Sequence, residues 1–390
     1  MISVADALAQ LFALVSPLAP EEVALTQANG RVLAQDVHAT RNQPPFAASA
    51  MDGYAVNAQA IKPGQSFDVI GEAAAGHKWK GTVGPGQTVR IFTGAPLPAG
   101  TDHVIIQENI TRDGDVITLD DSANDNPYVR PAGADFRTGD TIKAPRTLTP
   151  SDIALLAAMN IASVPVTRQP VVAIIATGDE LVQPGETPDD DQIIASNSYG
   201  LAALVQTLGA KARLLPIARD NIASLELAFD LAADADLIVT IGGASVGDHD
   251  LVGDVAQAKG MQRSFYKVAM RPGKPLMAGR MGHAAMIGLP GNPVSSMVCG
   301  HIFLAPVIRK MLGLGTQPAP RETLLLAQDI EANGPREHYM RAHAGPDGVT
   351  IFDRQDSALL TVLADANCLA VRPINEPERA AGTPIDIIRL

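Results

Sequence analysis

Glycines and carboxylates come together directly after a short apolar run, Leu237 to Ile241. The residues of interest in this loop are Gly242, Gly243, Ser245, Asp248 and Asp250. Glycine lets a backbone turn sharply and present amide N–H groups to an anion, and carboxylates are preferred ligands of Mg²⁺. The loop therefore predicts a site for a phosphate and a metal ion. An ordinary strand-to-helix turn with a solvated acidic rim is an equally good interpretation of the loop by itself.

Further carboxylates follow two neighbouring runs. Asp179 and Glu180 come after Val171 to Ala176, and Asp220 comes after Arg213 to Ala218. In an open α/β sheet of order 2-1-3-4-5, ligands lie beyond the carboxyl ends of the first and third strands. Together with Asp250, four carboxylates would then meet at one edge. Because clustered acids repel one another, a Mg²⁺ ion is the simplest explanation. For Asp220 alone, capping of the following helix is the better interpretation.

Positive charge follows later in the chain, at Lys267, Arg271 and Lys274. Their spacing suits binding of a phosphate or another oxyanion, although a solubilising basic turn is the alternative for each. A second segment stops a strand and opens a helix whose N-terminus can bind an anion; it contains Pro290, Asn292, Pro293, Ser295 and Ser296. The chain has neither a Walker A motif nor a dinucleotide-binding G-x-G-x-x-G. It therefore offers no support for an NTPase or a Rossmann dehydrogenase.

These residues need a sheet to hold them. Strand and helix patterns alternate between residues 169 and 316, which predicts an α/β domain with a doubly wound parallel sheet. Strands are expected at Val171 to Ala176, Arg213 to Ala218, Leu237 to Ile241, Phe265 to Met270 and Ala284 to Gly288. Helices are expected at Asn197 to Leu208, with Ser196 as N-cap, Ile222 to Ala233, and Pro293 to Leu312 with a bend at Pro306.

The remaining sequence predicts three further parts. Helical patterns at Ser3 to Val15, Glu21 to Ala28 and Ile153 to Met159 surround a β-rich stretch, in which Asp113-Gly114 signals a hairpin. We expect a mostly helical, discontinuous N-terminal domain (1–41 plus 132–168), interrupted by a β-rich insertion (42–131). After the linker Pro318-Ala319-Pro320, a small β domain (317–390) is expected, with strands at Thr323 to Ile330, His338 to Ala344, Val349 to Asp353, Leu369 to Pro373 and Ile385 to Arg389.

Composition narrows the class of protein. Of 390 residues, 46% are hydrophobic and 18% charged, as in globular proteins. The net charge of −12 argues against nucleic acid or an anionic membrane as a partner. The N-terminal segment lacks the basic residues of a signal peptide, and no apolar stretch suits a membrane span. Cys299 and Cys368 form no disulfide framework, which favours a cytoplasmic protein.

Six motifs, taken in order, make the chain similar to a known family. They are S-A-M-D-G-Y-A from Ser49, F-T-G-A-P-L-P from Phe92, T-G-D-E-L from Thr177, G-G-x-S-V-G-D-x-D from Gly242, R-P-G-K-P from Arg271 and L-P-G-N-P-V-S-S from Leu289. The chain resembles the MoeA family, the molybdopterin molybdenumtransferases, which include the C-terminal domain of gephyrin. The resemblance extends over nearly the whole chain.

This resemblance implies an enzyme of molybdenum cofactor biosynthesis. It would insert molybdate into the dithiolene of adenylylated molybdopterin, with Mg²⁺-dependent release of AMP. The fold implied is multidomain α/β, with a molybdopterin-binding type of parallel-sheet domain and a C-terminal β barrel. The molecule would be an elongated homodimer. Its active-site cleft would be shared between the α/β domain of one subunit and β domains of the other.

The resemblance also assigns roles to residues. Asp52 and Thr93 of the insertion would belong to the cleft; Glu180, Asp220 and Asp250 would hold the metal; and Lys267, Arg271 and Lys274 would hold anionic substrate. The substrate-binding residues implied are Gly242, Gly243, Ser245, Pro290, Asn292, Pro293, Ser295, Arg341 and Ser357. Two positions depart from the usual pattern. Arg271 stands where the family usually has Lys, which replaces a point charge by a planar fork, and Ala244 replaces a usual Val.

Two other functions remain open at the level of sequence. A molybdopterin adenylyltransferase would consume ATP and molybdopterin, and a gephyrin-like scaffold would cluster a partner protein without catalysis. Molybdate-dependent release of AMP by the purified chain separates an enzyme from a scaffold, whereas net adenylylation without molybdate would indicate the adenylyltransferase. A separate adenylyltransferase is also a candidate partner, because it could hand over the adenylate.

Overall fold

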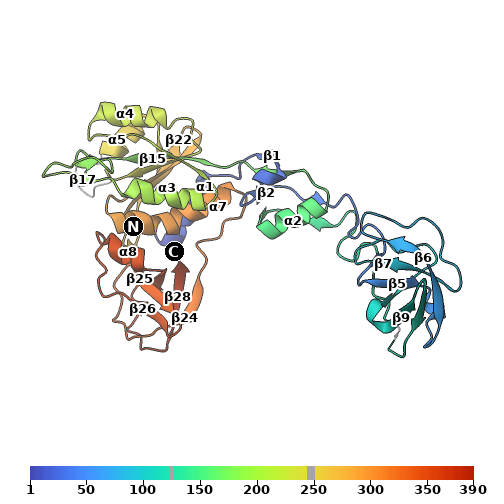
Figure 1. Cartoon of the computed structure of the whole chain (residues 1–390). Coiled ribbons are helices and arrows are strands. Elements are labelled where there is room, and N and C mark those ends of the chain that lie inside the picture. Colours follow the sequence, from blue (N-terminus) through green and yellow to red (C-terminus); the bar gives the residue numbers. More distant parts are fainter. Residues whose placement is uncertain (123–125, 244–250) are drawn as a thin grey trace.

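The molecule is elongated. The computed structural model describes residues 1–122, 126–243 and 251–390. Figure 1 shows an α/β unit and a β-rich C-terminal unit together at one end, a β-rich insertion at the other, and a small sheet with helix α2 between them. Both chain ends lie near the boundary of the α/β and C-terminal units (Figure 1). No helix in the described ranges is long and apolar enough to span a membrane.

The α/β unit is built on a six-stranded sheet of order β18-β15-β19-β23-β22-β20. Its strands are β15 (Val171–Ala176), β18 (Lys211–Leu214), β19 (Leu237–Ile241), β20 (Gln262–Lys267), β22 (Pro275–Met281) and β23 (Ala284–Leu289). The order 2-1-3 of the first three strands is confirmed. β15 and β19 are buried throughout or nearly so, as expected for strands covered on both faces.

The rest of this sheet differs from the prediction of an all-parallel sheet of order 2-1-3-4-5. β22 is antiparallel to both of its neighbours, so the sheet is mixed, and β23 takes the place beside β19. β22 escaped prediction because it begins at a proline and contains Gly279, both of which are uncommon within strands. The chain then turns tightly at Gly282 and returns as β23, which leaves β20 at the outer edge.

Helices cover both faces of the sheet, as Figure 1 shows. They are α1 (Val4–Leu14), α3 (Asn197–Thr207), α4 (Ile222–Leu231), α5 (Leu251–Ala258), α6 (Pro293–Cys299) and α7 (Ala305–Met311). α1 begins at a capping box made by Ser3 and Asp6. Its buried Leu8, Leu11 and Phe12 share one core with strands of the α/β sheet. α6 and α7 are joined by a π-helical turn, Gly300–Leu304, so the irregularity lies before Pro306 and not at it.

A small four-stranded sheet of order β1-β14-β2-β13 follows α1. Its strands are β1 (Pro20–Ala24), β2 (Val32–Leu33), β13 (Arg146–Thr147) and β14 (Ser163–Thr167), and α2 (Pro150–Ala158) accompanies them. The helix expected at Glu21 to Ala28 is wrong: its first half is β1 and its second half is the single turn η1 (Leu25–Gln27). Pairing with β14 overrides the local preference. Helical character here is therefore limited to α2.

The insertion is β-rich, as predicted. Its main sheet has the order β8-β5-β7-β6-β10-β9. The strands are β5 (Gly53–Val56), β6 (Ser66–Ala73), β7 (Gln87–Ile91), β8 (His103–Ile106), β9 (Ile110–Asp113) and β10 (Val116–Leu119), with the short turns η2 (Ala58–Ala60) and η3 (Gln107–Asn109). The predicted hairpin at Asp113-Gly114 joins β9 to β10. Two short pairs, β4 (Ala48–Ser49) with β11 (Val129–Arg130) and β3 (Val37–His38) with β12 (Thr141–Ile142), connect the insertion to the small sheet.

The C-terminal unit is a curled sheet of order β21-β25-β27-β28-β24, with β26 beside β25. Its strands are β21 (Met270–Arg271), β24 (Glu322–Leu325), β25 (Glu337–Gly345), β26 (Gly348–Ile351), β27 (Cys368–Arg372) and β28 (Pro384–Arg389). A bridge between Leu326 and Val349 brings the end of β24 to β26, as expected for a small barrel. α8 (Leu360–Asp365) was not predicted. β21 comes from the α/β part of the sequence and joins the two units.

Candidate active site

Three neighbouring strands of the α/β sheet end at the same edge and are hydrogen-bonded to one another there. Thr177 donates from its backbone N–H to Ile241 O at 3.0 Å, and Gly242 N–H donates to Leu289 O at 3.1 Å. The loops that follow therefore start from fixed positions. This is the edge at which open α/β sheets bind ligands.

Gly242 and Gly243 both adopt positive φ angles, of 90° and 66°. A Cβ atom at Gly242 would lie 2.8 Å from Thr177 O, and one at Gly243 would lie 2.1 Å from Val252 Cγ2. Both the backbone conformation and the close packing therefore require glycine. A Cβ on Gly291 of the third loop would lie 3.6 Å from Gly242 Cα, so the turns after β19 and β23 are packed together.

Glu180 and Asp220 come to the same cleft from the ends of β15 and β18. Arg219 ties their loops together: its Nη1 donates to Asp179 O at 2.8 Å and to Leu181 O at 3.1 Å. Asp179 does not line the cleft, because its Oδ1 accepts from Asp220 N–H at 3.0 Å. Asn221, not Asp220, caps α4 by accepting from Ser224 N–H at 2.9 Å. The capping role considered for Asp220 is therefore wrong, and its carboxylate is left for the cleft.

Positive side chains line another part of the cleft, namely Arg271, Lys274 and Arg336. β21 pairs Arg271 with His338 of β25, which brings Arg336 beside them from the C-terminal unit. His338 is buried, and burial followed by the positive charges of Arg271, Arg341, Arg372 and Arg336 lowers its pKa to about 4. His338 is therefore neutral at pH 7, and the basic character of this region comes from lysine and arginine.

The C-terminal unit closes the cleft through the segment that contains Gln355, Asp356 and Ser357. Asn292 Nδ2 donates to Ser357 Oγ at 3.1 Å, and Val294 N–H donates to Ser357 O at 3.0 Å. This segment is therefore fixed to the start of α6. Ser296, fully buried, donates to Pro290 O and closes the turn from the other side.

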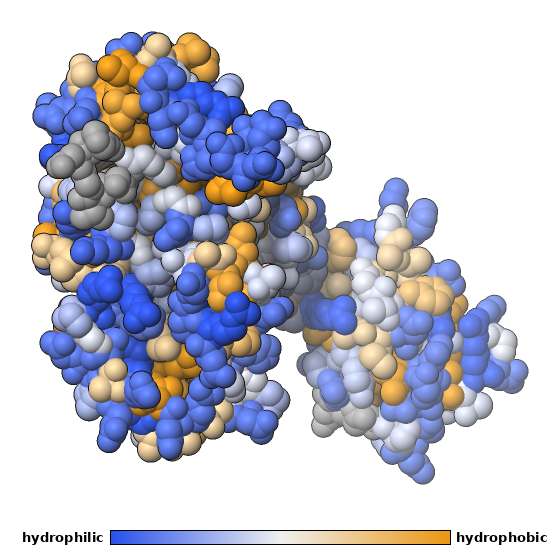
Figure 2. All heavy atoms as spheres, turned by 90° about the vertical axis from the view of Figure 1, so that its left-hand side faces the viewer, coloured by the Kyte–Doolittle hydropathy of each residue, from blue (hydrophilic) through white to orange (hydrophobic). Residues whose placement is uncertain are grey.

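The resulting cleft has a volume of about 1370 Å³. Of the predicted site residues, it is lined by Glu180, Asp220, Gly242, Gly243, Arg271, Lys274, Pro290, Asn292, Pro293, Ser295 and Ser357. Figure 2 views the molecule from the side of Figure 1 on which β17 (Ile193–Ile194) projects; between the upper and lower units this face is mostly pale, with both blue and orange residues. The structure thus brings most of the predicted residues together.

Four predicted residues do not line this cleft. Lys267 ends β20, the outermost strand, and its Nζ lies over the ring of Tyr266, 5.2 Å from the centroid. Arg341 is fully buried behind the cleft, where its Nη2 donates to Asp356 O at 2.9 Å. Its Nε and Nη1 have no hydrogen-bond partner among the described residues. Arg341 therefore supports the segment that contains Ser357 and does not face the opening.

Asp52 and Thr93 lie in the insertion, at the far end of the molecule from the cleft (Figure 1). They contact each other: Asp52 Oδ1 accepts from the N–H and from Oγ1 of Thr93, both at 2.8 Å. The Thr93 N–H, then its hydroxyl and the charge of Arg90, lower the pKa of Asp52 below its usual value. Asp52 is therefore an ionised carboxylate on the surface of the insertion, held in place by Thr93. Ser245 and Asp250 lie outside the described residues.

Sequence reasoning missed several residues that line the cleft. Asp254 lies on α5, and Asn197 begins α3 and donates from Nδ2 to Gly291 O at 2.7 Å. Asp254 could have been found, because it lies in the first turn of a helix that begins directly after the acidic loop. Arg336 has no local motif, and only the pairing of β21 with β25 reveals it.

A predicted metal site can be examined only in part. In the described ranges, no three His, Cys, Asp or Glu residues are grouped as metal ligands, and Asp250 is outside these ranges. Glu180 and Asp220 do line one cleft, and neither carboxylate forms an ion pair with a described residue. Two carboxylates with no ion-pair partner in the described ranges, beside two glycine turns, suit a hard cation that also contacts phosphate.

Comparison with known proteins places this architecture in a family. Three family models match: the MoeA N-terminal region (domain I and II) at residues 2–160, a probable molybdopterin binding domain at 173–310, and the MoeA C-terminal region (domain IV) at 323–390. The molybdopterin molybdenumtransferase of Nostoc sp. is 36% identical, with 100% of this chain and 94% of that protein covered. The chain belongs to the MoeA family.

Other MoeA relatives agree over similar lengths. The molybdopterin molybdenumtransferase of Haemophilus influenzae is 33% identical, with 95% of this chain and 94% of that protein covered. The crystal structure of a molybdopterin biosynthesis MoeA protein from Pyrococcus horikoshii superposes with a TM-score of 0.86 at 27% identity, covering 100% of this chain and 99% of that one. As a MoeA family member, the chain is an enzyme of molybdenum cofactor biosynthesis, and neither the adenylyltransferase nor the scaffold alternative is favoured.

Proposed function

We propose that the chain inserts molybdate into the dithiolene of adenylylated molybdopterin and releases AMP in a Mg²⁺-dependent step. The observation that supports this is one cleft in which Glu180 and Asp220 are combined with Arg271, Lys274 and Arg336. Both molybdate and the phosphoanhydride are anions. A site for them must provide positive charge as well as ligands for a cation that contacts phosphate.

Glu180 and Asp220 would hold Mg²⁺, together with Asp250, which directly precedes the cleft residue Leu251 in the sequence. When bound, the ion would neutralise the phosphate charges of the adenylate. Arg271, Lys274 and Arg336 would orient the oxyanion, and the turn at Gly242 and Gly243 would position the diphosphate. An oxygen of water or molybdate would attack the AMP phosphorus; the anhydride bond breaks, and its electrons remain on the molybdopterin phosphate. Attack by water, with loss of a proton to solvent, gives AMP directly, whereas attack by molybdate gives an adenylyl–molybdate anhydride that water then hydrolyses to AMP and molybdate.

We further propose that the functional molecule is a homodimer whose cleft is completed by the partner. Asp52 and Thr93 are supported as site residues only by the resemblance, and they lie far from the cleft of their own chain (Figure 1). A partner's insertion would supply them. A separate adenylyltransferase would deliver the adenylylated substrate. The two cysteines are free and buried, which fits a reducing cytoplasm.

The direct test is molybdate-dependent release of AMP from adenylylated molybdopterin by the purified chain. Asp220→Asn should lower the rate by about 100-fold or more, because a neutral amide is a poor substitute for a carboxylate ligand. Asp190→Asn is the matched control: it removes an exposed carboxylate that does not line the cleft, and the rate should stay the same. Equal rates in wild type and Asp220→Asn, or release that ignores molybdate, would contradict the proposal.

A further inference from the structure

Two exposed isoleucines line this cleft, together with Leu181, Ile241 and Leu251. Ile193 is 58% exposed and Ile194 is 38% exposed, and both line the cleft beside Leu181. They form β17, which pairs in parallel with β16 (Leu181–Val182) in a two-stranded ribbon that projects from the α/β unit (Figure 1). Large apolar side chains in a concave site become shielded from water when a ligand with an apolar surface covers them.

The ribbon is fixed to the acidic part of the cleft. Ile193 N–H donates to Glu180 O at 2.8 Å, so the first isoleucine is directly beside a proposed metal ligand. Arg219 holds the carbonyls of Asp179 and Leu181 and precedes Asp220. On the other side, Tyr199 of α3 donates from its hydroxyl to Gln183 Oε1 at 3.0 Å. These hydrogen bonds therefore fix the position of the two isoleucines relative to the carboxylates of Glu180 and Asp220.

Strand order sets the sequence of chemical groups along the cleft. Asp220 and Glu180 follow β18 and β15, the glycine turn follows β19, the proline turn follows β23, and Lys274 directly precedes β22. With strands about 4.8 Å apart, the acidic and basic ends are separated by about 14 Å, measured from β15 to β22. Along the strand ends a bound molecule meets carboxylates, backbone amides and cations in that order. The ribbon adjoins the carboxylates at Ile193, and the chain that follows it reaches the proline turn through the bond from Asn197 to Gly291 O.

We propose that Ile193 and Ile194 form the subsite for the adenine ring of the adenylylated substrate. This inference rests on the proposed function. The substrate has the same linear order as the cleft: a purine, a diphosphate, and a pterin whose sulfur atoms must meet the oxyanion. With the diphosphate at the carboxylates and the oxyanion at Arg271 and Lys274, the purine reaches the ribbon. The pterin cannot occupy the ribbon, because its dithiolene has to lie at the basic end.

The experiment measures binding of AMP and of ribose 5-phosphate, both with Mg²⁺, to the full chain by calorimetry. In the double variant Ile193→Ser/Ile194→Ser, the Kd for AMP should rise about tenfold, since the purine loses its apolar contact. The Kd for ribose 5-phosphate, which has no base, should not change. Leu227→Ser is the matched control, because Leu227 is 61% exposed on α4 and does not line the cleft. Ile193→Leu/Ile194→Leu should restore AMP binding, and equal melting temperatures show that all variants fold.

Two results would overturn the inference while leaving the proposed function intact, provided that the wild type still releases AMP in the presence of molybdate. One is an unchanged Kd for AMP; if self-association is weaker in the same variant, the ribbon is a contact between copies. The other is an equal loss of AMP and ribose 5-phosphate binding, which would make the ribbon a support for the carboxylates. If the wild type neither binds nor releases AMP, the proposed function fails and the inference fails with it.

Discussion

His338 is a buried imidazole surrounded by the guanidinium groups of Arg271, Arg336, Arg341 and Arg372. Its pKa falls from 6.5 to about 4 on folding, because burial and the neighbouring charges oppose protonation. Between these two pH values the unfolded chain binds a proton that the folded chain does not. The free energy of unfolding should therefore rise with pH from about 4 to 6.5, by up to about 3 kcal/mol from this group, and then level off.

Replacing His338 by Asn should flatten this part of the pH profile, measured by urea denaturation at several pH values. His77→Asn is the control: His77 is exposed in the insertion and takes no part in the arginine cluster around His338, so the variant should keep the wild-type slope. The buried His301, whose pKa is also lowered by burial, remains in both variants and leaves a smaller slope of the same sign. If the pH profile of His338→Asn equals that of the wild type, His338 does not cause the rise in the free energy of unfolding between about pH 4 and 6.5.

Membership of the cleft could largely be predicted from the sequence for residues that lie at the end of a recognisable strand. Glu180 and Asp220 follow apolar runs that are easy to recognise, Lys274 belongs to a basic motif after another, and the structure places all three in one cleft. Lys267 was expected beside them but ends an outer strand. Arg336 was not expected, because its place depends on a pairing between two strands far apart in the sequence. Local motifs therefore indicate chemistry better than they indicate which neighbours meet.

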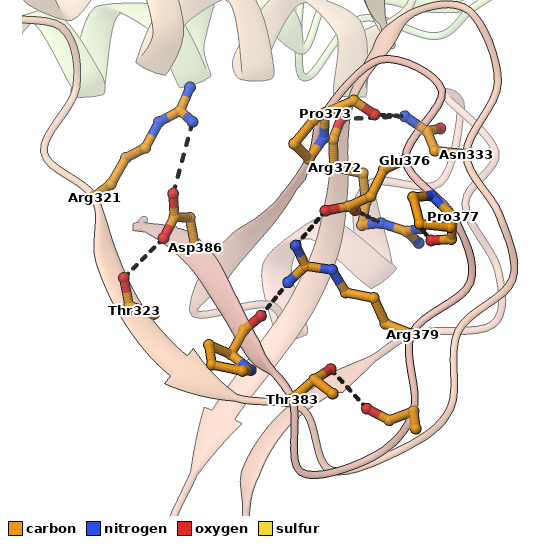
Figure 3. Close-up of polar contacts among 12 residues, drawn as sticks. Arg321, Thr323, Asn333, Arg372, Pro373, Glu376, Pro377, Arg379, Thr383 and Asp386 are labelled. Carbon is orange, nitrogen blue, oxygen red and sulfur yellow. Dashed lines mark hydrogen bonds and ion pairs between the residues drawn. The ribbon is translucent and has the colours of Figure 1, made fainter.

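At the scale of elements, an ion-pair network holds the loop that follows β27. Glu376, a buried carboxylate, pairs with Arg372 Nε on one side and with Arg379 on the other, as Figure 3 shows. Asn333 Nδ2 donates to Pro373 O at 2.7 Å and to Arg336 O at 2.9 Å. The network therefore also fixes the segment that brings Arg336 to the cleft.

Glu376→Gln should lower the free energy of unfolding by about 3 kcal/mol, because it leaves Arg372 buried without its counter-charge. Asp386→Asn is the comparison within the same unit. Asp386 Oδ2 lies 4.0 Å from Arg321 Nη1 at a half-exposed position and its Oδ1 accepts from Thr323 Oγ1 (Figure 3). An asparagine can still accept from Thr323, so the loss of charge should cost less than about 1 kcal/mol. Chemical denaturation measures both values. Similar costs for the two variants would show that burial does not decide the strength of these pairs.

Elements with strong patterns were predicted best. β15, β19 and α1 were expected within one residue of their observed ends, because burial on both faces or a capping box defines them. β22 and α8 were missed, and β1 was taken for a helix. β22 was missed because a proline and Gly279 weaken its strand pattern, although both of its partners are close in sequence. For β1, a partner distant in sequence determines the local structure. It pairs with β14, whose residues come well over a hundred positions later.

For the whole molecule, the separation of Asp52 from the cleft leads to a complementation test. Chains with Asp52→Ala and chains with Asp220→Ala should each be inactive alone. If the cleft is shared between partners, random pairing makes half of the dimers mixed, and each mixed dimer has one intact site. The mixture should therefore recover about a quarter of wild-type activity.

The assay is molybdate-dependent AMP release after the two variants are coexpressed or refolded together. Mixing two copies of the same variant provides the control and should give no recovery. Activity in the mixture no greater than the sum of the separate chains would place each complete site within one chain.

The division of the chain into an interrupted N-terminal part, an insertion, an α/β part and a C-terminal part was expected from composition and resemblance. The distance between Asp52 and the cleft within one chain emerges only from the fold.

Helix α1 is made from the first residues of the chain, yet its core partners, such as Leu276 and Val307, follow more than 250 positions later. Ile2 N–H donates to Lys267 O at 3.1 Å, and Arg280 Nη2 donates to Leu14 O at 2.8 Å. During synthesis on the ribosome, the apolar face of α1 is therefore exposed to water until the strands and helices that it packs against have been made. A truncated protein that starts at residue 169 would lack α1 and expose the apolar surface that α1 covers. It should therefore aggregate and be poorly soluble unless a peptide of residues 1–15 is added.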